Sequence, residues 1–440
     1  MVGVTSLLAA LFSLYSIFVR PGFALGVVII SMLVWPEYLR MPVGVVQMSI
    51  PRVIAFILIV KLLFNGRGKK ITLNRVDLSI FICWVWVIAA SFIGGADSGE
   101  ISRQIGRGLD TVLIYMATRL AIKDTRDIAG LFIPCAFLAL FMGVMGVVEA
   151  VTFYSPYQKL EVYRAWVWFD KPPEYRLGLL RAKASTEVHI YFGLSMAMLT
   201  GILWSVRGYA KSKSLLIVSV ISGALGTFSS MSSGPWIAFL AFLGFNAFAF
   251  KTSLIKPLIW FIIFVCIGVE LASNRHFYSL VGYIALSAGT AWYRVRLMEI
   301  AFDNLDEFWL YGVAGNWPHH WGALLDGRGH IDVVNHFLIM GLYGGILAMF
   351  LYIYSHYAAI KMSVKFWKRS NVISDRKAIF TLVSLLLGID VASMSVGLFG
   401  PPLMLSFVVL GLIVSVSTFP SQDLKAKSKK NRASNRPLSS

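Results

Sequence analysis

The sequence predicts an all-α polytopic integral membrane protein with about 12–13 transmembrane helices. Of its 440 residues, 57% are hydrophobic and only 14% are charged, whereas soluble domains carry about 25% charged residues. Apolar runs recur along most of the chain, and each is long enough to cross a hydrocarbon core of about 30 Å, which needs roughly 20 helical residues. Outer-membrane barrels show short alternating segments instead, so these runs predict helices.

The N-terminal region, residues 1–153, alternates apolar runs with short links. Its third run ends in the basic stretch 67–70, and its fourth leads into the acidic, turn-rich stretch 94–100. Because cytoplasmic links are enriched in Lys and Arg, we expect the first link inside and the second outside. The helices are expected at about 4–19, 22–38, 51–64, 77–93, 105–122 and 128–153.

Residues 154–188 form the first of two larger loops, and the alternation of spans places it on the periplasmic side. The loop is nevertheless basic, which is against the usual charge bias of outer loops. This departure favours a functional role for its charges.

The central transmembrane region, residues 189–272, is followed by the second and larger periplasmic loop, residues 273–334. The central helices are expected at about 189–207, 214–230, 233–250 and 255–272. The C-terminal helices, residues 335–419, are expected at about 335–359, 377–397 and 402–419. Residues 420–440 are a basic tail, expected to be disordered and cytoplasmic.

The net charge of +18 would suggest nucleic acid as a partner of a soluble protein. Here most Lys and Arg lie in short links and in the tail, as expected of cytoplasmic segments, and no nucleic-acid-binding module accompanies them. We therefore expect membrane lipids and no nucleic acid as partners.

The two periplasmic loops carry seven Arg and four His, and a fifth His, His336, follows the second loop directly. Guanidinium groups grip phosphate oxygens through paired donors, and histidine exchanges a proton near neutral pH. Six of the 13 Trp also lie in these loops, where they could stack on sugars or belong to the membrane interface. The combination favours a sugar carried on a lipid diphosphate. The charged residues are Arg164, Arg176, Arg181, Arg275, Arg294, Arg296, Arg328, His276, His319, His320, His330 and His336.

No metal signature is present in the sequence. His319 and His320 are adjacent, so their side chains point apart in regular structure, and no HExxH motif or DxD-like pair occurs. We predict no metal site and no cofactor.

A few ionisable residues fall within the predicted helices. Asp390 is the clearest deep charge, and it is expected either to form a structural hydrogen bond or to serve a relay. Lys61 and Arg119 lie near inner helix ends, where we expect them to snorkel. A further group near the outer ends is expected to face the same cavity as the loops: Arg107, Asp110, Glu149 and Glu270.

Three separated stretches carry a resemblance to a known family. They are Arg181–Glu187 leading into His189–Gly193, Tyr293–Glu299 followed by Tyr311–Gly315, and Asn335–Leu338 with Gly341, Gly344 and Gly345. In this order, the chain resembles the O-antigen ligase and polysaccharide polymerase superfamily (Wzy_C-like) of bacterial membrane glycosyltransferases. It departs from the family pattern at Ala184, where a glycine is frequent, and at Met298, where a tryptophan is common.

The resemblance implies a GT-C-like helical fold in the bacterial cytoplasmic (inner) membrane, acting at the periplasmic face on undecaprenyl-diphosphate-linked glycans. By matching position, Arg181 and Arg294 would bind the diphosphate leaving group, and His336 would accept the proton of the attacking hydroxyl. Direct displacement would invert the sugar carbon. The expected substrate-binding residues are Arg296, Asn335, Glu187 and Trp317.

The expected partners are the lipid-linked donor, a glycan or lipid acceptor, and other polysaccharide-assembly proteins. A polymerase and a ligase share the donor and differ in the acceptor, and the departures from the pattern favour the polymerase of exopolysaccharide or O-antigen. A flippase or exporter of lipid-linked sugars and a structural subunit of an assembly complex are the alternatives. An exporter needs several charged residues along a path through the bilayer. Asp390 is the only clear charge deep within the predicted helices, so the sequence favours an enzyme.

Overall fold

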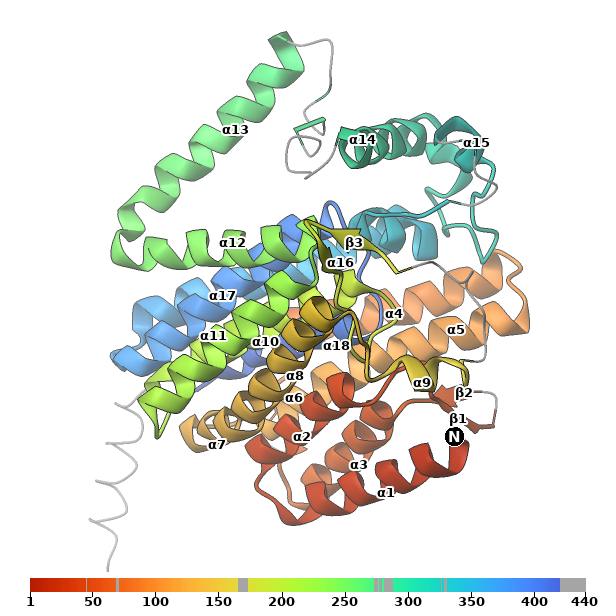
Figure 1. Cartoon of the computed structure of the whole chain (residues 1–440). Helices are drawn as coiled ribbons and strands as arrows, with labels where there is room; N and C mark the ends of the chain where they lie inside the picture. The colour runs from red at the N-terminus through yellow and green to blue at the C-terminus, as the bar shows by residue number, and fades with distance from the viewer. Residues whose placement is uncertain are drawn as a thin grey trace, which may run out of the picture.

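The computed structural model describes residues 1–44, 46–68, 71–164, 173–272, 276, 279–280, 288–325, 327 and 331–419. These residues form a bundle of helices that run roughly alongside one another, with two short antiparallel hairpins at one end (Figure 1). The predicted predominance of helix is confirmed. Five helical segments among the described residues are long and apolar enough to cross a membrane: 75–93, 125–152, 189–208, 252–272 and 336–369.

The N-terminal third contains eight α-helices and one hairpin in the described residues. Asn74 and Asp77 form a capping box that starts α4. The predicted helix at 105–122 is instead the end of a longer helical segment that begins at Ser98 and contains a π-helical turn. The elements are α1 (Val2–Phe18), α2 (Pro21–Val34), β1 (Met41–Val43), β2 (Val46–Met48), α3 (Ile50–Phe64), α4 (Arg75–Ile93), α5 (Ser98–Gly108), the π-helix η2 (Leu109–Leu113), α6 (Ile114–Ala121), α7 (Thr125–Gly130) and α8 (Phe132–Thr152).

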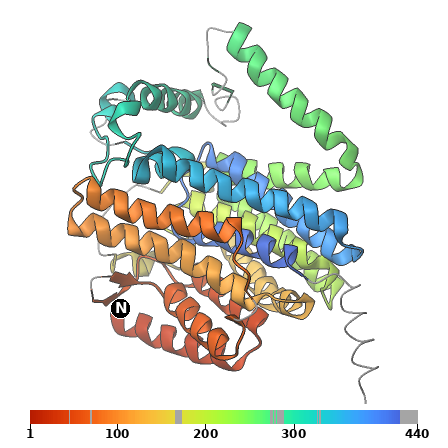
Figure 2. The same ribbon diagram turned by 180° about the vertical axis from the view of Figure 1, so that it is seen from behind.

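The middle of the chain starts with a short helix and a small hairpin and continues into four apolar helices. All four were predicted from the sequence to within a few residues. The last of them, α13, stands apart from the bundle in both views (Figures 1 and 2), and none of its residues is buried. The elements are α9 (Gln158–Glu161), β3 (Tyr175–Arg176), β4 (Leu179–Leu180), α10 (His189–Ser205), η3 (Val206–Gly208), α11 (Lys213–Ser229), α12 (Ser233–Ala247), η4 (Phe248–Phe250), η5 (Thr252–Leu254) and α13 (Ile255–Ala272).

The stretch expected as the second periplasmic loop contains helices that the sequence analysis did not predict. Its α14 (Ala288–Asp303) buries Leu297, Ile300 and Ala301, which share one face of a helix. The short helices η7 (Leu305–Glu307) and α15 (Trp321–Leu325) follow. This helical arm lies over the end of the bundle that carries β3 (Figure 1).

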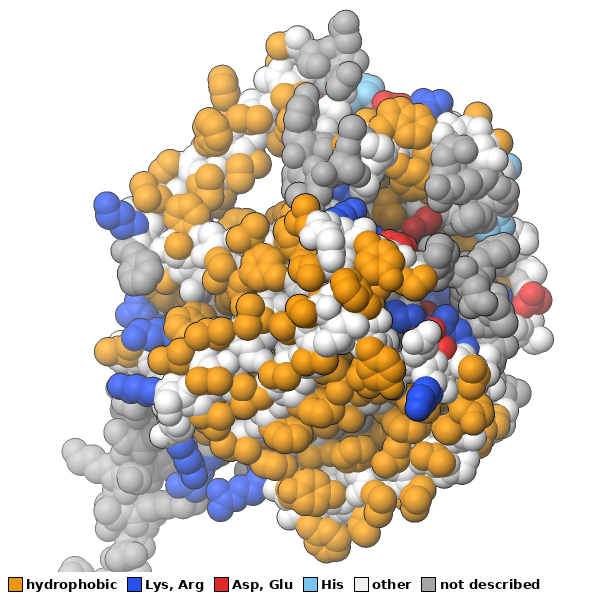
Figure 3. Space-filling view, viewed as in Figure 1, with side chains coloured by type: hydrophobic (Ala, Val, Ile, Leu, Met, Phe, Trp, Pro, Cys, Tyr) orange, Lys and Arg blue, Asp and Glu red, His pale blue; other side chains and the backbone are white. Residues whose placement is uncertain are grey.

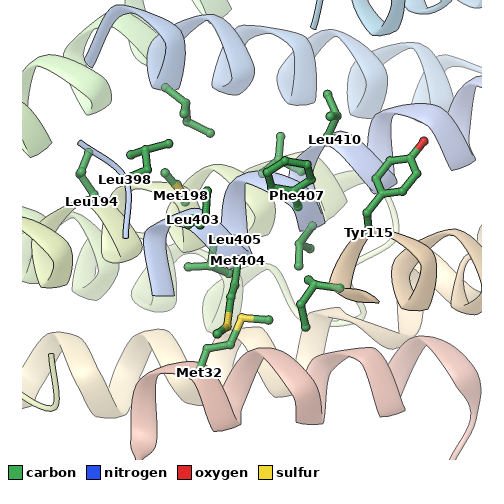
Figure 4. Close-up of a cluster of buried hydrophobic side chains, with 14 of the residues drawn as sticks. Met32, Tyr115, Leu194, Met198, Leu398, Leu403, Met404, Leu405, Phe407 and Leu410 are labelled. Atoms are coloured by element: carbon green, nitrogen blue, oxygen red, sulfur yellow. The ribbon is translucent and has the colours of Figure 1, made fainter. Parts of the chain in front are cut away.

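Three C-terminal helices complete the fold: α16 (His336–Arg369), α17 (Ile373–Ser393) and α18 (Pro401–Ser417). Every residue of α18 is buried, so this helix is the centre of the bundle. Side chains of α18 such as Met404 and Phe407 pack against Met32, Tyr115 and Met198 from three other helices (Figure 4). A helix that is apolar on all sides is expected to be enclosed in this way.

Charge is distributed unevenly between the two ends of the bundle. In Figure 3, the side chains at the left end that are charged are Lys and Arg, whereas Lys and Arg appear together with Asp, Glu and His at the right and upper right. The exposed basic residues of the left end are Lys211, Lys213, Lys251, Lys256, Lys361, Lys365, Lys368, Arg369 and Lys377.

Two expectations about charges in the helices are wrong. Arg119 is only 2% exposed and pairs with Asp77 at 3.1 Å, so it does not snorkel. Lys61 donates from Nζ to the carbonyl oxygens of Ser16 and Val19 at 2.8 and 2.6 Å, which satisfies the C-terminal end of α1. Both were misjudged because their partners lie on helices distant in sequence.

Candidate functional site

The helix α16 is broken at Gly344 and Gly345, both of which have non-helical backbone angles. Gly345 has φ +71° and ψ −172°, a conformation open essentially to glycine alone, and a Cβ there would lie 2.3 Å from the carbonyl oxygen of Leu310. The rings of His336 and Tyr352 lie 5.2 Å apart, whereas a straight helix would separate these residues by about 24 Å. The chain therefore bends sharply, and the first part of α16 packs against the second.

His336 is the first residue of α16 and is 2% exposed. Its Nδ1 accepts a hydrogen bond from the backbone N–H of Leu398 at 3.2 Å. A neutral imidazole has one donor and one acceptor nitrogen, so its proton must be on Nε2. That Nε2 is buried and has no hydrogen-bond partner among the described residues.

Asn335 precedes His336 and caps the helix. Its Oδ1 accepts from the N–H of Leu338 at 3.1 Å, and its Nδ2 lies 3.4 Å from Met298 Sδ and 3.2 Å from the carbonyl oxygen of Met394. Both ends of the amide are thus engaged within the protein. The predicted substrate-binding residue holds α14, α16 and the end of α17 together in this structure.

Arg294 lies one helical turn before Met298 on the same face of α14. The preceding residue, Tyr293, exchanges hydrogen bonds with the backbone of Asp332 at 2.9 and 3.1 Å. Since Tyr293 contacts residue 332 and Met298 contacts residue 335, Arg294 runs alongside the segment that leads into His336.

The guanidinium of Arg294 is 6% exposed, and its Nε and Nη1 have no hydrogen-bond partner among the described residues. Burial lowers the pKa of Arg294, but a guanidinium keeps its charge at neutral pH. A buried cation is normally paired. Arg294 therefore offers unused donors to an anion.

Arg296, which was predicted to assist, has a different environment from Arg294. It forms an ion pair with Glu299 at 2.9 Å, and both side chains are more than one third exposed. Side chains two positions apart on a helix point about 200° away from each other. Arg296 therefore does not lie on the buried face of α14 that carries Arg294.

Arg181 follows β4 and forms an ion pair with Glu174 from the same hairpin. Its Nε is buried without a partner among the described residues. Burial lowers the pKa of Arg181, and the Glu174 carboxylate acts in the opposite direction. Glu174 is 44% exposed, so this carboxylate reaches solvent while it holds the guanidinium.

The turn between α11 and α12 connects the Arg181 hairpin with the segment around His336. The N–H of Ala182 donates to the Ser229 carbonyl at 3.1 Å, and a Cβ at Gly234 would lie 2.4 Å from Val396. Val396 is two residues from Leu398, which donates to His336. The structure thus brings Arg181, Arg294 and His336 to the same end of the bundle, although no hydrogen bond joins any two of them within the described ranges.

Glu187 lies in the loop before α10 and is half-buried. Burial raises the pKa of Glu37, Arg40 lowers it, and the charges of Asp110 and Glu187 add to the increase. Glu187 therefore lies close enough to Glu37 for its charge to affect the pKa of that carboxyl, and it forms part of an acidic group at this end of the bundle.

Trp317 stacks on Tyr343 with ring centroids 5.8 Å apart and an interplanar angle of 20°. The guanidinium of Arg107 lies 4.3 Å from the centroid of the same tyrosine ring and pairs with Glu100 at 3.1 Å. Tyr343 is seven residues after His336, so both project from one face of the first part of α16. Trp317 is thus held in a stack beside the candidate site.

Asp390 pairs with His356, whose Nδ1 lies 2.7 Å from Oδ1 of the carboxylate. The ring of Tyr352 lies between the two histidines of α16, 4.6 Å from His356 and 5.2 Å from His336. The sequence analysis missed His356 and Tyr352. The signal that singled out Asp390, a polar residue within an apolar run, could also have identified His356.

Three of the other charges expected near the outer helix ends have separate partners. Asp110 pairs with Arg52 at 2.6 Å, and Glu149 accepts the backbone N–H groups of Lys183 and Ala184 at 3.2 and 2.9 Å. Glu270 pairs with His276 at 2.9 Å.

Arg164 was grouped with the loop cations, and its Nε and Nη2 are also buried without a partner in the described part of the chain. Its guanidinium lies 4.8 Å from the ring centroid of Tyr38. Trp166, Trp168, Arg275, Arg328 and His330, which were predicted to lie in the loops, fall outside the described residues.

Among the described residues, no group of three or more His, Cys, Asp or Glu is placed to hold a metal ion. The groups at this end of the bundle that have no partner among the described residues include buried guanidinium nitrogens and the Nε2 of His336, and they lie beside aromatic rings and the acidic group that contains Glu37 and Glu187. No model of a known protein family matches the chain, and no curated protein matches it at a significant level.

Proposed function

We propose that the chain is a metal-independent membrane glycosyltransferase that moves a glycan from a lipid diphosphate to an acceptor hydroxyl. The observation that carries the proposal is the guanidinium of Arg294, which is buried, charged and without a partner among the described residues. A buried donor left unsatisfied costs about 1–3 kcal/mol, and a charged one costs more. A protein tolerates such an unsatisfied donor where a bound anion accepts its hydrogen bond.

A diphosphate fits this site chemically because its oxygens accept several hydrogen bonds and carry negative charge. During transfer, the bond between the sugar carbon and the diphosphate oxygen breaks, and charge accumulates on the leaving diphosphate. Preorganised cations that face this charge lower the barrier to departure. Arg294 would provide this stabilisation in the place where other enzymes use a metal ion.

Arg181 is proposed as the second cation for the diphosphate. Its buried Nε is unused, and its present partner is a partly exposed carboxylate. Because the Glu174 carboxylate is 44% exposed, it can return to water when an incoming diphosphate takes its place on Arg181.

The proposed location is the bacterial cytoplasmic membrane, crossed about 12–13 times in a GT-C-like arrangement. The basic end in Figure 3 supports a cytoplasmic position for that end, because Lys and Arg are enriched in cytoplasmic segments. The end with α14, the β3–β4 hairpin and the start of α16 would then face the periplasm. A donor on the outer leaflet would meet Arg294 there.

The proposed reaction is polymerisation of undecaprenyl-diphosphate-linked oligosaccharide units in exopolysaccharide or O-antigen assembly. A ligase that transfers the glycan to a lipid acceptor would use the same cations for the donor. The product separates the two, because a polymerase makes lipid-linked chains of several lengths and a ligase makes a glycan bound to its final acceptor.

Export of lipid-linked sugars is the second candidate function, and two observations favour it. The helix α16 is broken within a candidate membrane span, and His356 of the same span pairs with Asp390 of the neighbouring helix α17. Transporters use broken helices and buried ionisable residues in this way. In an exporter, however, Arg294, which has no partner among the described residues, would have no leaving group to stabilise.

The test is complementation of a deletion strain with the wild-type chain, Arg294→Ala and Arg103→Ala. Arg103 is an exposed arginine paired with Glu100 at 2.6 Å and serves as the matched control. The transferase proposal expects Arg294→Ala to abolish polymer or capped glycan and to leave lipid-linked units on the outer leaflet. Units retained on the inner leaflet would support export, and normal product from Arg294→Ala would overturn the transferase proposal.

A further inference from the structure

We propose that His336 works as a hydrogen-bond donor to the diphosphate of an isoprenyl diphosphate, through Nε2, and forms one anion site with Arg294. This inference rests on the proposed function and changes the role expected for His336 from proton acceptor to ligand. No proton moves to or from the imidazole in this arrangement; the proton of the acceptor hydroxyl passes to an oxygen of the departing diphosphate, which gains negative charge as its bond to the sugar carbon breaks.

The first argument is the direction of the hydrogen bond at Nδ1. A backbone N–H can only donate, and Leu398 donates to Nδ1 at 3.2 Å. A proton on Nδ1 would face the Leu398 N–H directly, which excludes both the Nδ1–H tautomer and the imidazolium while this contact exists. The neutral ring then carries its proton on Nε2, and Nε2 has no lone pair for the proton of an acceptor hydroxyl.

The second argument is that the ring is held in this orientation. His336 is 2% exposed, Leu398 is fully buried, and the Tyr352 ring packs against the imidazole at an interplanar angle of 76°. A ring flip would replace Nδ1 by a carbon and leave a buried backbone N–H without an acceptor, which costs about 1–3 kcal/mol. The hydrogen-bond network therefore selects one orientation.

The third argument is that three of the buried donors without a partner in the described part of the chain belong to these two residues: Arg294 Nε, Arg294 Nη1 and His336 Nε2. Arg294 and the residues just before His336 lie side by side, as the Tyr293–Asp332 and Asn335–Met298 contacts show. Two donors from a cation and one from a neutral ring suit the non-bridging oxygens of a diphosphate. An uncharged ligand would leave the guanidinium charge unpaired.

The test uses the full-length protein in detergent, titrated with farnesyl diphosphate, and compares three variants of His336. His336→Gln keeps an N–H donor near the position of Nε2. His336→Asn keeps an acceptor near Nδ1 for Leu398 but has no donor at the far position. His336→Ala removes both, and His319→Gln, at an exposed histidine, is the matched control.

We expect His336→Asn and His336→Ala to weaken binding about 10-fold to 100-fold, as expected for the loss of a hydrogen bond to a charged group. His336→Gln is expected to remain within about threefold of the wild type and to retain transfer activity. The same order of variants is expected for product formation in cells. Because His336→Asn preserves the Leu398 contact, its thermal unfolding should match that of the wild type, which separates lost binding from lost folding.

Three other results have distinct meanings. If all His336 variants bind farnesyl diphosphate like the wild type, while His336→Gln makes no product, then His336 is a proton acceptor and this inference fails, although the transferase proposal stands. If His336→Gln loses affinity as His336→Asn does, the donor role fails in the same way. If the wild type does not bind farnesyl diphosphate, and Arg294→Ala also makes normal product, the proposed function fails together with the inference.

Discussion

The imidazole of His336 lies against the ring of Tyr352 in a T-shaped contact, with centroids 5.2 Å apart, although both belong to the helix α16. The contact exists because the helix breaks at Gly344 and Gly345. The break is held from outside, since the N–H of Ile346 donates to the Trp309 carbonyl at 2.9 Å and Trp86 Nε1 donates to the Gly344 carbonyl at 2.7 Å. The arm that carries α14 is thus tied to the same point that positions His336.

Gly345→Ala is predicted to destabilise the protein by about 3 kcal/mol, because its backbone angles exclude a side chain and the Cβ would clash with Leu310. Thermal unfolding in detergent measures this. Gly244→Ala, at a helical glycine with open space around its Cβ, is the matched control and should be neutral or stabilising by about 0.5–1 kcal/mol. Equal stability of the two variants would mean that the break in α16 is not a required feature.

Arg294→Ala is predicted to leave the unfolding temperature unchanged or to raise it, while product formation falls at least about 100-fold. The reason is that this guanidinium has no partner to lose in the described structure. Arg52→Ala is the comparison, because Arg52 is 3% exposed and pairs with Asp110, so its loss should cost about 3–5 kcal/mol. A large destabilisation by Arg294→Ala would show that the side chain has a structural partner.

Asp390→Ala is predicted to lower stability by about 1–3 kcal/mol, because the Nδ1 of His356 would lose its partner. Asp390→Asn keeps an acceptor oxygen and should lose less. Activity per folded molecule is expected to remain normal in both, as a structural hydrogen bond requires. If both variants stay folded and lose activity, the carboxylate serves a relay instead.

Glu174→Gln is predicted to raise the affinity for farnesyl diphosphate about twofold to fivefold, because the ligand no longer competes with a carboxylate for Arg181. Titration of the purified variant measures the change. Glu174→Asp, which keeps the charge, should resemble the wild type. A fall in affinity for Glu174→Gln would mean that Glu174 positions the guanidinium rather than competes for it.

Cysteine labelling is predicted to place the two ends of the bundle on opposite sides of the membrane. In a background where Cys83, Cys135 and Cys266 are replaced by Ala, Asp306→Cys should react with an impermeant maleimide added to intact cells. Lys365→Cys, at the basic end, should react only after permeabilisation, as the positive-inside rule requires. Labelling of both positions in intact cells would contradict the proposed topology.

Helix positions were largely predictable, because long apolar runs and their links are local features of the chain. The runs predicted near 51–64, 77–93, 189–207 and 255–272 match α3, α4, α10 and α13 closely. The helix α14 was missed because only three of its positions, Leu297, Ile300 and Ala301, form a buried apolar face, and it lies between charged and turn-forming residues.

The candidate site was predictable as a set of residue types but not as an arrangement. The sequence singled out Arg181, Arg294 and His336. The structure adds that Arg294 has no partner among the described residues, that Arg181 is held by Glu174, and that Arg296 pairs with Glu299. These differences depend on which side of a helix or hairpin is buried by other segments. Those segments are distant in sequence, so a single stretch of sequence does not show which side they bury.

The sequence by itself determined that the chain is helical and apolar enough for a membrane, because burial of backbone groups in lipid forces long apolar runs into helices. It also singled out the residue types in the two predicted loops that could carry chemistry. Only the tertiary structure decided the protonated nitrogen of His336, the partner of Asp390 and the lack of a partner for Arg294 in the part of the chain that the structure describes. Each of these depends on contacts between residues far apart in the chain, which exist only when the helices pack.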